Sequence, residues 1–368
     1  MAEQAVKKVR IGFVGVGFMG QVAHLKNYAT LPECEVVALA EIRPETGKLV
    51  AQRYGVPNVY TSHVDMLAKE KLDGVVCAQM FDVHAVLLPE IYGRVKHLFT
   101  QKPIAIGVDA GAKLADNAKR TKTVHMVGYH KRSDPATIYA RQVIDGWRQS
   151  GEMGKLKYVR ITMPSGDWIA NGGIGHLNAT ETAAIPPIAR EPVITDLAGA
   201  DAVASAWKWK GDAGDYVRFV NYYIHQVNYM RHMLGEPYRV TFADKSGVLL
   251  AVESESGITG TIEMTPYRTT VDWHETILVA FEKGYVHVRL PAPLAVNRPG
   301  EVEVFKDVGN NAMPETLRPS LPWVHAMRQE AINFLKVCRG EMAPPCDVFE
   351  AVEDLRIARE YIRQWKGK

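Results

Sequence analysis

A glycine-rich turn near the N-terminus has the residue types and spacing of a nucleotide-binding loop. Gly15, Gly17 and Gly20 follow a short apolar run, and a stretch with helical periodicity begins there. In a GxGxxG turn the first glycine permits a tight turn, the second lets the backbone approach a pyrophosphate, and the third lets helix and strand pack closely. The diphosphate would lie at the helix N-terminus, where unpaired N–H groups favour negative charge. We therefore predict a dinucleotide site.

An acid at a defined distance from this turn indicates which dinucleotide is bound. Glu41 lies 21 residues beyond Gly20, close to the offset of about 20 expected for the carboxylate that binds the ribose 2′-hydroxyl. A carboxylate there repels a 2′-phosphate, so the sequence favours NAD over NADP. Arg43 leaves an alternative open, since a nearby cation can tolerate the phosphate or stack on adenine. The structural alternative for Glu41 is capping of the helix that follows Pro44.

A lysine follows another predicted strand of the same half. Gln101-Lys102-Pro103 comes after an apolar run that ends at Phe99. Ligands of doubly wound folds bind outside the carboxyl ends of the strands, so we expect Lys102 to face the site. An ordinary surface lysine in a loop is the alternative.

A stripe of neutral polar residues marks a helix in the second half of the chain. Asn221, His225, Asn228 and His232 are spaced so that they share one face of a helix predicted over 217–234. The stripe contains no Lys, Glu or Asp, although a solvated helix face usually carries them. It therefore indicates a partly enclosed polar surface, either a reaction site or a domain interface. Because no acid or cysteine accompanies these residues, we expect no metal.

The elements that position these residues divide the chain into two parts. Residues 1–128 alternate short apolar runs with helical stretches, which implies a parallel, doubly wound sheet and a Rossmann dinucleotide-binding domain. Strands are expected at Val9–Val14, Glu35–Ala40, Gly74–Cys77, Val95–Phe99 and Val124–Val127, and helices at Phe18–Thr30, Pro44–Tyr54, Ser62–Ala68, His84–Tyr92 and Asp109–Lys122.

Residues 129–368 are predicted to form an α+β domain for substrate binding and oligomerisation, with a large, mostly antiparallel open sheet. The hairpin Thr276–Phe281 and Tyr285–Leu290, joined by Glu-Lys-Gly, is the clearest antiparallel signal. The segment 165–215 shows no periodicity, and such a long loop usually carries function or wraps a neighbour. Other elements are expected at 136–149, Lys155–Met163, 323–338 and 347–363.

Composition excludes several classes of protein. With 368 residues the chain can form two cores, and its 47% hydrophobic and 23% charged residues are typical of soluble proteins. A net charge of +3 is too small to suggest nucleic-acid binding. No apolar run approaches the roughly 18 residues of a membrane span, and the first residues lack a signal-peptide pattern. The four cysteines form no CxxC pair. We expect a cytoplasmic protein with no nucleic-acid or membrane partner.

Together these motifs resemble the Gfo/Idh/MocA oxidoreductase family, which includes glucose–fructose oxidoreductase and inositol dehydrogenases. The resemblance covers nearly the whole chain and is carried by Gly15–Gly20, Glu41, Lys102-Pro103, 127–135 and 224–237. It implies hydride transfer between NAD and a secondary hydroxyl of a sugar, cyclitol or glycoside. It also implies a homo-oligomer, either a dimer or a tetramer.

The resemblance further implies a catalytic pair, with His225 as general base and Lys102 polarising the oxygen. The chain departs from the family pattern at Gln101, Asn221 and Asn228, each of which replaces a usual acid. An asparagine can bind a sugar hydroxyl but brings no negative charge to support an imidazolium. The acid–base arrangement is therefore open, with Asp167 or Tyr129 as alternative suppliers of the missing group.

The expected site residues form three groups. The catalytic residues are Lys102, His225 and Asn221. The cofactor contacts are Gly15, Gly17, Phe18, Met19, Gly20, Glu41, Arg43, His84, Gln101 and Lys102. The substrate contacts are Lys102, Tyr129, Lys131, Arg132, Asp167, Trp168, Asn221, His225 and Asn228. The loop 165–215 also contains aromatic and polar residues that suit either stacking on a sugar ring or packing of the loop itself. They are Trp168, Trp207, Trp209, Asp167, His176 and Asp212.

Three other functions fit the same sequence. The first is a glycoside-processing enzyme of this fold that uses tightly bound NAD transiently. The second is a reductase of a non-sugar ligand. The third is a noncatalytic NAD-dependent sensor. The absence of the usual acid at Asn221 supports this alternative, whereas the presence of both Lys102 and His225 counts against it.

Overall fold

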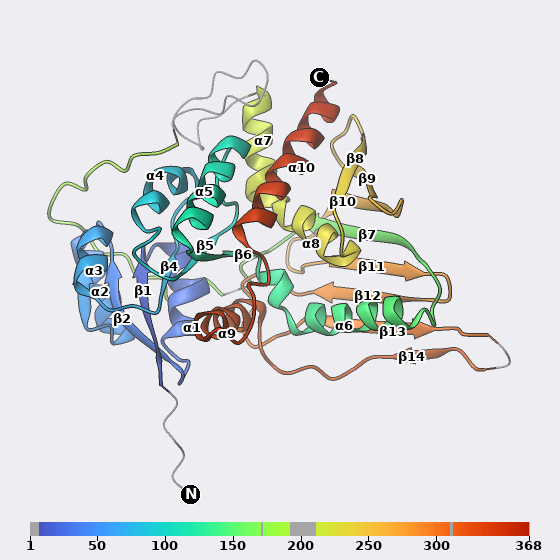
Figure 1. Ribbon diagram of the computed structural model, residues 1–368, viewed down its shortest axis with the longest axis horizontal. Coiled ribbons are helices and arrows are strands. Elements are labelled where there is room, and N and C mark those ends of the chain that lie inside the picture. The colour runs from blue at the N-terminus through green and yellow to red at the C-terminus, as the bar shows by residue number, and fades with distance from the viewer. Residues whose placement is uncertain (1–6, 171, 192–210, 310–311, 368) are drawn as a thin grey trace, which may run out of the picture. The chain divides into compact units, whose positions relative to one another are not determined.

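A computed structural model describes residues 7–170, 172–191, 211–309 and 312–367, and it places the strands in two sheets (Figure 1). The first sheet has six parallel strands in the order β3-β2-β1-β4-β5-β6, the order of a Rossmann fold. Its strands are β1 (Val9–Val14), β2 (Cys34–Ala40), β3 (Asn58–Tyr60), β4 (Gly74–Cys77), β5 (His97–Gln101) and β6 (Val124–Gly128).

Helices connect these strands, as the alternating pattern predicts. A π-helical turn at Gly20–Leu25 leads into α1 (Lys26–Tyr28). It is followed by α2 (Pro44–Tyr54), α3 (His63–Lys69), α4 (His84–Leu87) and α5 (Val108–Thr121). The helix expected over His84–Tyr92 is shorter, because Pro89 follows α4 and has no N–H for a helical hydrogen bond.

The second sheet has eight strands in the order β14-β13-β12-β11-β7-β10-β9-β8, of which only the β7–β10 pair is parallel. Its strands are β7 (Leu156–Ser165), β8 (Tyr238–Ala243), β9 (Leu249–Ser254), β10 (Thr259–Arg268), β11 (Glu275–Phe281), β12 (Gly284–Leu290), β13 (Glu301–Lys306) and β14 (Glu315–Leu317). Helix α6 (Pro135–Ser150) packs along β12 and β13, and α8 (Ile224–Leu234) packs on β7 and β10 (Figure 1). The predicted hairpin is confirmed as β11 and β12.

The single helix expected over 217–234 is wrong. Two helices occupy that range, α7 (Gly211–Tyr222) and α8, and Tyr223 lies between them. Tyr222 and Tyr223 both pack against the apolar cluster of Met163, Trp273 and Ala292. Consecutive residues of a regular helix point in different directions. Packing both tyrosines against the same cluster therefore favours an interruption of the helix at Tyr223.

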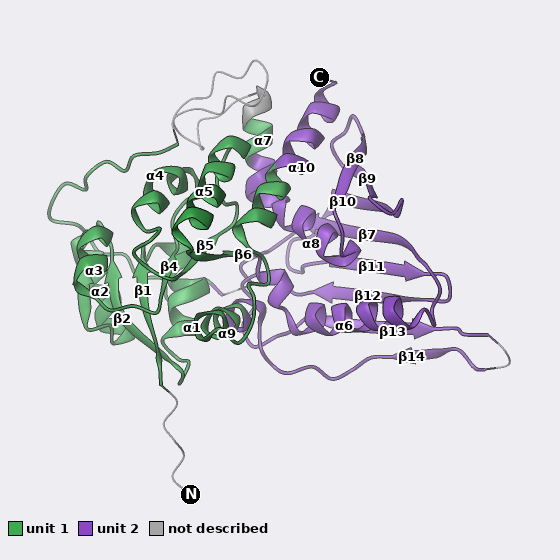
Figure 2. Cartoon of the chain, viewed as in Figure 1, with its two compact units in different colours: residues 1–128, 173–217, 330–355 green, residues 129–172, 218–329, 356–368 purple. Residues whose placement is uncertain are grey.

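By their contacts the residues form two compact units (Figure 2). Unit 1 consists of Met1–Gly128, Gly173–Val217 and Glu330–Leu355, and unit 2 of Tyr129–Gly172, Arg218–Gln329 and Arg356–Lys368. The break after Gly128 is where the sequence divides the chain. Two segments after residue 128 also belong to unit 1, Gly173–Val217 and Glu330–Leu355. The second contains most of α9 (Ala326–Arg339) and the first part of α10 (Val348–Lys366). A division into cofactor and substrate domains at residue 128 stays a proposal.

Candidate cofactor and substrate site

The turn after β1 forms a cradle that requires glycine at both ends. Gly15 has a φ of +84°, and a Cβ there would lie 2.2 Å from the side-chain nitrogen of Gln79. A Cβ on Gly20 would lie 2.8 Å from the carbonyl oxygen of Gly15. A Cβ on Gly17, in contrast, would meet no heavy atom within 4 Å. The backbone at Gly17 is therefore open to an approaching group, as a pyrophosphate requires.

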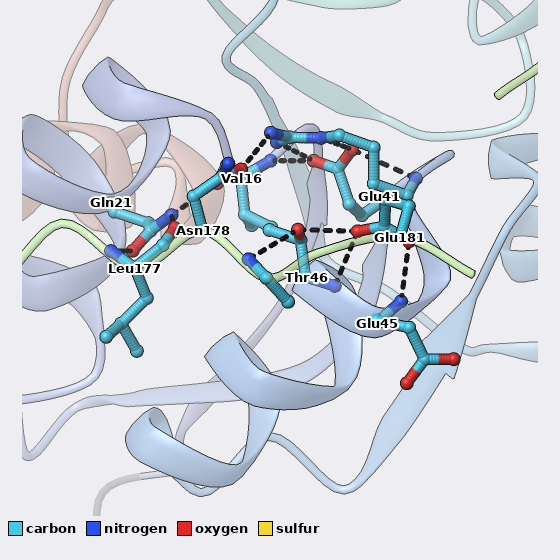
Figure 3. A network of polar contacts seen from close by, with 10 residues as sticks. Val16, Gln21, Glu41, Glu45, Thr46, Leu177, Asn178 and Glu181 are labelled. Atoms are coloured by element: carbon cyan, nitrogen blue, oxygen red, sulfur yellow. Dashed lines mark hydrogen bonds and ion pairs between the residues drawn. The ribbon is translucent and has the colours of Figure 1, made fainter. Parts of the chain in front are cut away.

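Glu41 closes the cradle from the end of β2. Its side chain is 5% exposed, and its carboxylate accepts a hydrogen bond from the Val16 backbone N–H at 3.0 Å. The Arg43 guanidinium pairs with the same carboxylate at 2.8 Å, and this hydrogen bond raises the pKa of Arg43 (Figure 3). An anion thus lies beside the glycine turn, where the sequence predicts the ribose carboxylate.

The cradle also lies where ligands of this fold bind. Gly15 contacts Ala78 and Gln79, which follow β4, and β1 and β4 are the neighbours between which the strand order reverses. In open parallel sheets that reversal is the crevice for nucleotides. The open backbone at Gly17 and the carboxylate at Glu41 therefore fit NAD.

The other expected cofactor contacts lie around the same end of the sheet in unit 1. Phe18 and Met19 are half-buried, and the Phe18 ring meets the edge of the His176 ring at 5.5 Å. His84 is buried and its Nδ1 donates to the Ile104 carbonyl at 3.0 Å. Burial lowers the pKa of His84 to about 4, so the imidazole is neutral near pH 7.

Gln101, which replaces the usual acid before Lys102, contacts a buried imidazole. Its side-chain amide hydrogen-bonds His24, and burial lowers the pKa of His24 to about 3. A neutral amide matches this neutral ring, whereas a carboxylate would bring an uncompensated charge into the core. Lys102 itself is half-buried and joined to Pro103 by a cis peptide bond.

In unit 2, aromatic rings gather around His225, the second residue of α8. The ring of His130 lies edge-on to it at a centroid distance of 4.7 Å, and that of Tyr129 at 6.0 Å. Tyr129 and His130 are buried, and His225 is half-buried. The imidazole is thus held between rings rather than exposed on a free helix face. Sequence reasoning missed His130.

A buried ion pair lies beside these rings. Lys131 pairs with Glu275, and both side chains are almost completely buried. The Glu275 carboxylate also accepts hydrogen bonds from Gln226 at 2.7 Å and from the Trp273 indole at 3.1 Å. Burial lowers the pKa of Lys131, and Glu275 opposes that shift. Glu275 therefore orients Lys131, and a substrate contact by Lys131 stays a prediction.

A second buried polar pair joins α8 to the segment after β6. Arg132 donates from Nε to the side-chain oxygen of Asn228 at 2.6 Å. Asn228, expected to bind substrate, therefore holds this guanidinium in place. The structure thus brings five of the expected substrate contacts together in unit 2: Tyr129, Lys131, Arg132, His225 and Asn228.

Other expected substrate contacts have different surroundings. The Asp167 carboxylate accepts hydrogen bonds from the nearby backbone of Ile169 and Ala170, at 2.9 and 3.1 Å. Trp168 is 36% exposed. Asn221 is exposed on α7, before the helix break, so it no longer shares a helical stripe with His225. Trp207 and Trp209 lie outside the described residues.

The comparisons with known proteins agree with this fold. Residues 9–129 match the Gfo/Idh/MocA model, described as an oxidoreductase family with an NAD-binding Rossmann fold. The inositol 2-dehydrogenase of Rhizobium meliloti is 29% identical over 217 residues, which are 56% of this chain and 62% of that protein. The similarity to the Gfo/Idh/MocA family thus covers the Rossmann part of the chain. The resemblance and the NAD cofactor expected from the sequence are thereby confirmed.

Two further comparisons concern a curated relative and a solved structure. A glycosyl hydrolase family 109 protein of Shewanella putrefaciens is 28% identical over 168 residues, which are 42% of this chain and 36% of that protein. A solved oxidoreductase of Agrobacterium radiobacter in complex with NAD+, L-tartaric acid and magnesium shares the fold, with a TM-score of 0.68 and 14% identity over 98% of both chains. The chain spans between about half and two thirds of the length of the first curated relatives it matches.

Within the described ranges, no helix is both long and apolar enough to cross a membrane. The same ranges contain no group of three or more His, Cys, Asp or Glu side chains placed to hold a metal ion.

Proposed function

We propose that this protein is an NAD-dependent dehydrogenase of the Gfo/Idh/MocA family that oxidises a secondary hydroxyl of a sugar, cyclitol or glycoside. The observation that carries the proposal is the cradle in unit 1, where an open backbone at Gly17 lies beside the Glu41 carboxylate. The relative described as an inositol 2-dehydrogenase supports a polyhydroxylated substrate. Bound NAD would accept the hydride.

The residues of unit 2 would handle the proton. His225 would take the hydroxyl proton, and the rings of Tyr129 and His130 would fix the orientation of its imidazole. Lys102 would polarise the same oxygen. Asn228 would act indirectly, by holding Arg132 toward the substrate. We also propose that Asn221 binds a substrate hydroxyl from α7.

The main alternative is a glycoside-processing enzyme in which NAD is reduced and reoxidised in place. The glycosyl hydrolase family 109 relative favours this alternative. The two functions differ in whether NADH is released. A homo-oligomeric state and a cytoplasmic location stay predictions of the sequence.

The test is an absorbance screen for NADH with the purified protein, NAD+ and a panel of aldoses, inositols and glycosides. We expect NADH to accumulate in proportion to the sugar oxidised. Cleavage of a glycoside without net NADH would contradict the dehydrogenase and favour the alternative. No turnover with any member of the panel, together with NAD binding, would favour the sensor.

A further inference from the structure

An extended segment of unit 1, far from the cradle in the sequence, runs beside the cofactor site. We name residues 175–181 the strap. The Arg53 side chain donates to the Gly175 carbonyl at 3.0 Å, which anchors the start of the strap. The strap has no regular secondary structure, and its polar contacts go to the elements that form the cradle (Figure 3).

A reciprocal pair of hydrogen bonds holds the strap to the helix after the glycine turn. The Leu177 N–H donates to the side-chain oxygen of Gln21, and the Gln21 amide donates to the Leu177 carbonyl, both at 2.9 Å. The same amide also donates to the Val16 carbonyl at 2.7 Å, inside the turn. The position of the strap is therefore set by the nucleotide loop itself.

The far end of the strap places a carboxylate at the N-terminus of α2. Glu181 accepts hydrogen bonds from the N–H groups of Glu45 and Thr46 at 3.0 and 2.9 Å, and from the Thr46 hydroxyl at 2.6 Å. The Ala179 N–H donates to that hydroxyl at 3.2 Å. Backbone N–H groups at the start of a helix commonly bind an anion. Here the Glu181 carboxylate occupies this anion-binding position, which we call the seat.

The strap also engages the cation beside this seat. The Arg43 guanidinium donates to the side-chain oxygen of Asn178 at 2.8 Å and pairs with Glu41 at 2.8 Å. In NADP-binding Rossmann domains an arginine near the end of the second strand accommodates the 2′-phosphate. Here that arginine is held by Glu41 and Asn178, and the adjacent N–H groups are held by Glu181.

We propose that Glu181 determines cofactor specificity, because its carboxylate occupies the seat that a 2′-phosphate would need. NAD, with a 2′-hydroxyl at Glu41, needs none of the donors that Glu181 uses. NADP would have to place its phosphate beside two carboxylates, and like charges in contact oppose binding strongly. The inference rests on the proposed NAD-dependent function and extends it to a residue about 140 positions from Glu41 in the sequence.

The test measures binding of NADH and NADPH by nucleotide fluorescence, without substrate. The variants are Glu181→Ala, which empties the seat, and Glu181→Gln, which keeps its volume if the first variant folds poorly. Glu45→Gln is the matched control, because it removes one negative charge from the same helical turn but its side chain pairs with Lys48. We expect Glu181→Ala to tighten NADPH binding about ten-fold or more and to change NADH binding less than about two-fold. The control should change neither.

Several results would overturn the inference. Unchanged NADPH binding in both Glu181 variants would show that the seat does not control specificity. An equal change for both nucleotides would show that the strap competes with the whole dinucleotide. An equal effect of Glu45→Gln would assign the preference to the general charge of that turn. A wild-type protein that binds neither nucleotide would contradict the proposed function itself, and the inference with it.

Discussion

At the scale of single residues, the glycines of the cradle differ in what they do. Gly15 and Gly20 serve the fold, because a Cβ on either would collide with neighbouring atoms. Gly17 has open space around it and no positive φ that would require glycine. Packing of the turn therefore does not require glycine at position 17, and the open backbone there leaves room for a ligand.

This difference predicts the behaviour of Gly17→Ala. We expect the stability of the variant to change little, while the dissociation constant for NADH rises about ten-fold, equivalent to about 1.4 kcal/mol. Thermal unfolding and a binding titration measure the two effects. Gly146→Ala, within α6, is the control, since a Cβ there also meets no atom within 4 Å. It should leave NADH binding unchanged. A strongly destabilised Gly17→Ala would contradict the open cradle.

The proposed catalytic pair predicts a separation of turnover from cofactor binding. General acid–base groups contribute about 10²–10⁴-fold to rate, so His225→Ala and Lys102→Met should each lower kcat by about that factor. NADH affinity should change much less than kcat, because neither change alters the glycine turn or Glu41. Steady-state kinetics and the same titration provide the two readouts. If His225→Ala keeps near-normal turnover, the base lies elsewhere, and Asp167 or Tyr129 becomes the next candidate.

At the scale of elements, periodicity predicts the strands and hairpins well where one face is buried. In β11, Ile277, Val279 and Phe281 are buried and alternate with half-exposed residues, and the short turn to β12 fixes the register. Periodicity does not predict the break at Tyr223, because the break depends on packing against Trp273 and Ala292. The three-residue strand β3 was also missed, since so short a segment shows no clear alternation.

Helix α9 contains a buried acid that predicts a pH-dependent stability. Glu330 is 1% exposed, and within the described part of the chain neither carboxyl oxygen has a hydrogen-bond partner. Burial raises its pKa from 4.5 to about 8. The folded protein thus keeps a proton that the unfolded chain releases, so the stabilisation present below pH 4.5 is lost as the pH rises toward 8.

Glu330→Gln should remove this loss. We expect the variant to have a free energy of unfolding higher by the order of 2 kcal/mol at pH 8, with a much smaller difference at pH 5. Urea unfolding at the two pH values measures it. The exposed Glu33→Gln should behave as the wild type at both. A difference between variant and wild type that is the same at pH 5 and pH 8 would contradict the assignment.

At the scale of the whole molecule, part of the site is formed by residues that are far apart in the sequence, and these residues could not be predicted from it. The glycine turn, Glu41 and Lys102 were recognisable because strands and fixed spacing position them in one half of the chain. Asn178 and Glu181 were missed, since the strap has no periodicity and their hydrogen bonds join residues 135 and 136 positions apart in the sequence. His130 was missed for a related reason: its importance comes from the ring of His225, about 95 residues later.

The large sheet of unit 2 has a partly exposed apolar face, which predicts that the protein forms a homo-oligomer. On β11 and β12 one face is buried, while Leu278, Ala280 and Tyr285 on the other remain partly exposed, and Tyr285 stacks on Phe305 at 5.3 Å. Such a surface suits contact with a second copy of the chain. Light scattering should show a dimer or tetramer, and Leu278→Arg should dissociate it. Val271→Arg, on a side chain that is 86% exposed, should not. A wild-type monomer at micromolar concentration would contradict this prediction.

The most direct test of the central claim follows the hydride. A substrate identified in the NADH screen is labelled with deuterium on the carbon that bears the reacting hydroxyl, and the nucleotide is analysed by mass spectrometry after turnover. Direct transfer predicts one deuterium on the nicotinamide ring of NADH for each molecule of ketone formed. Ketone formed alongside unlabelled NADH, or deuterium released to water, would contradict an NAD-dependent dehydrogenase.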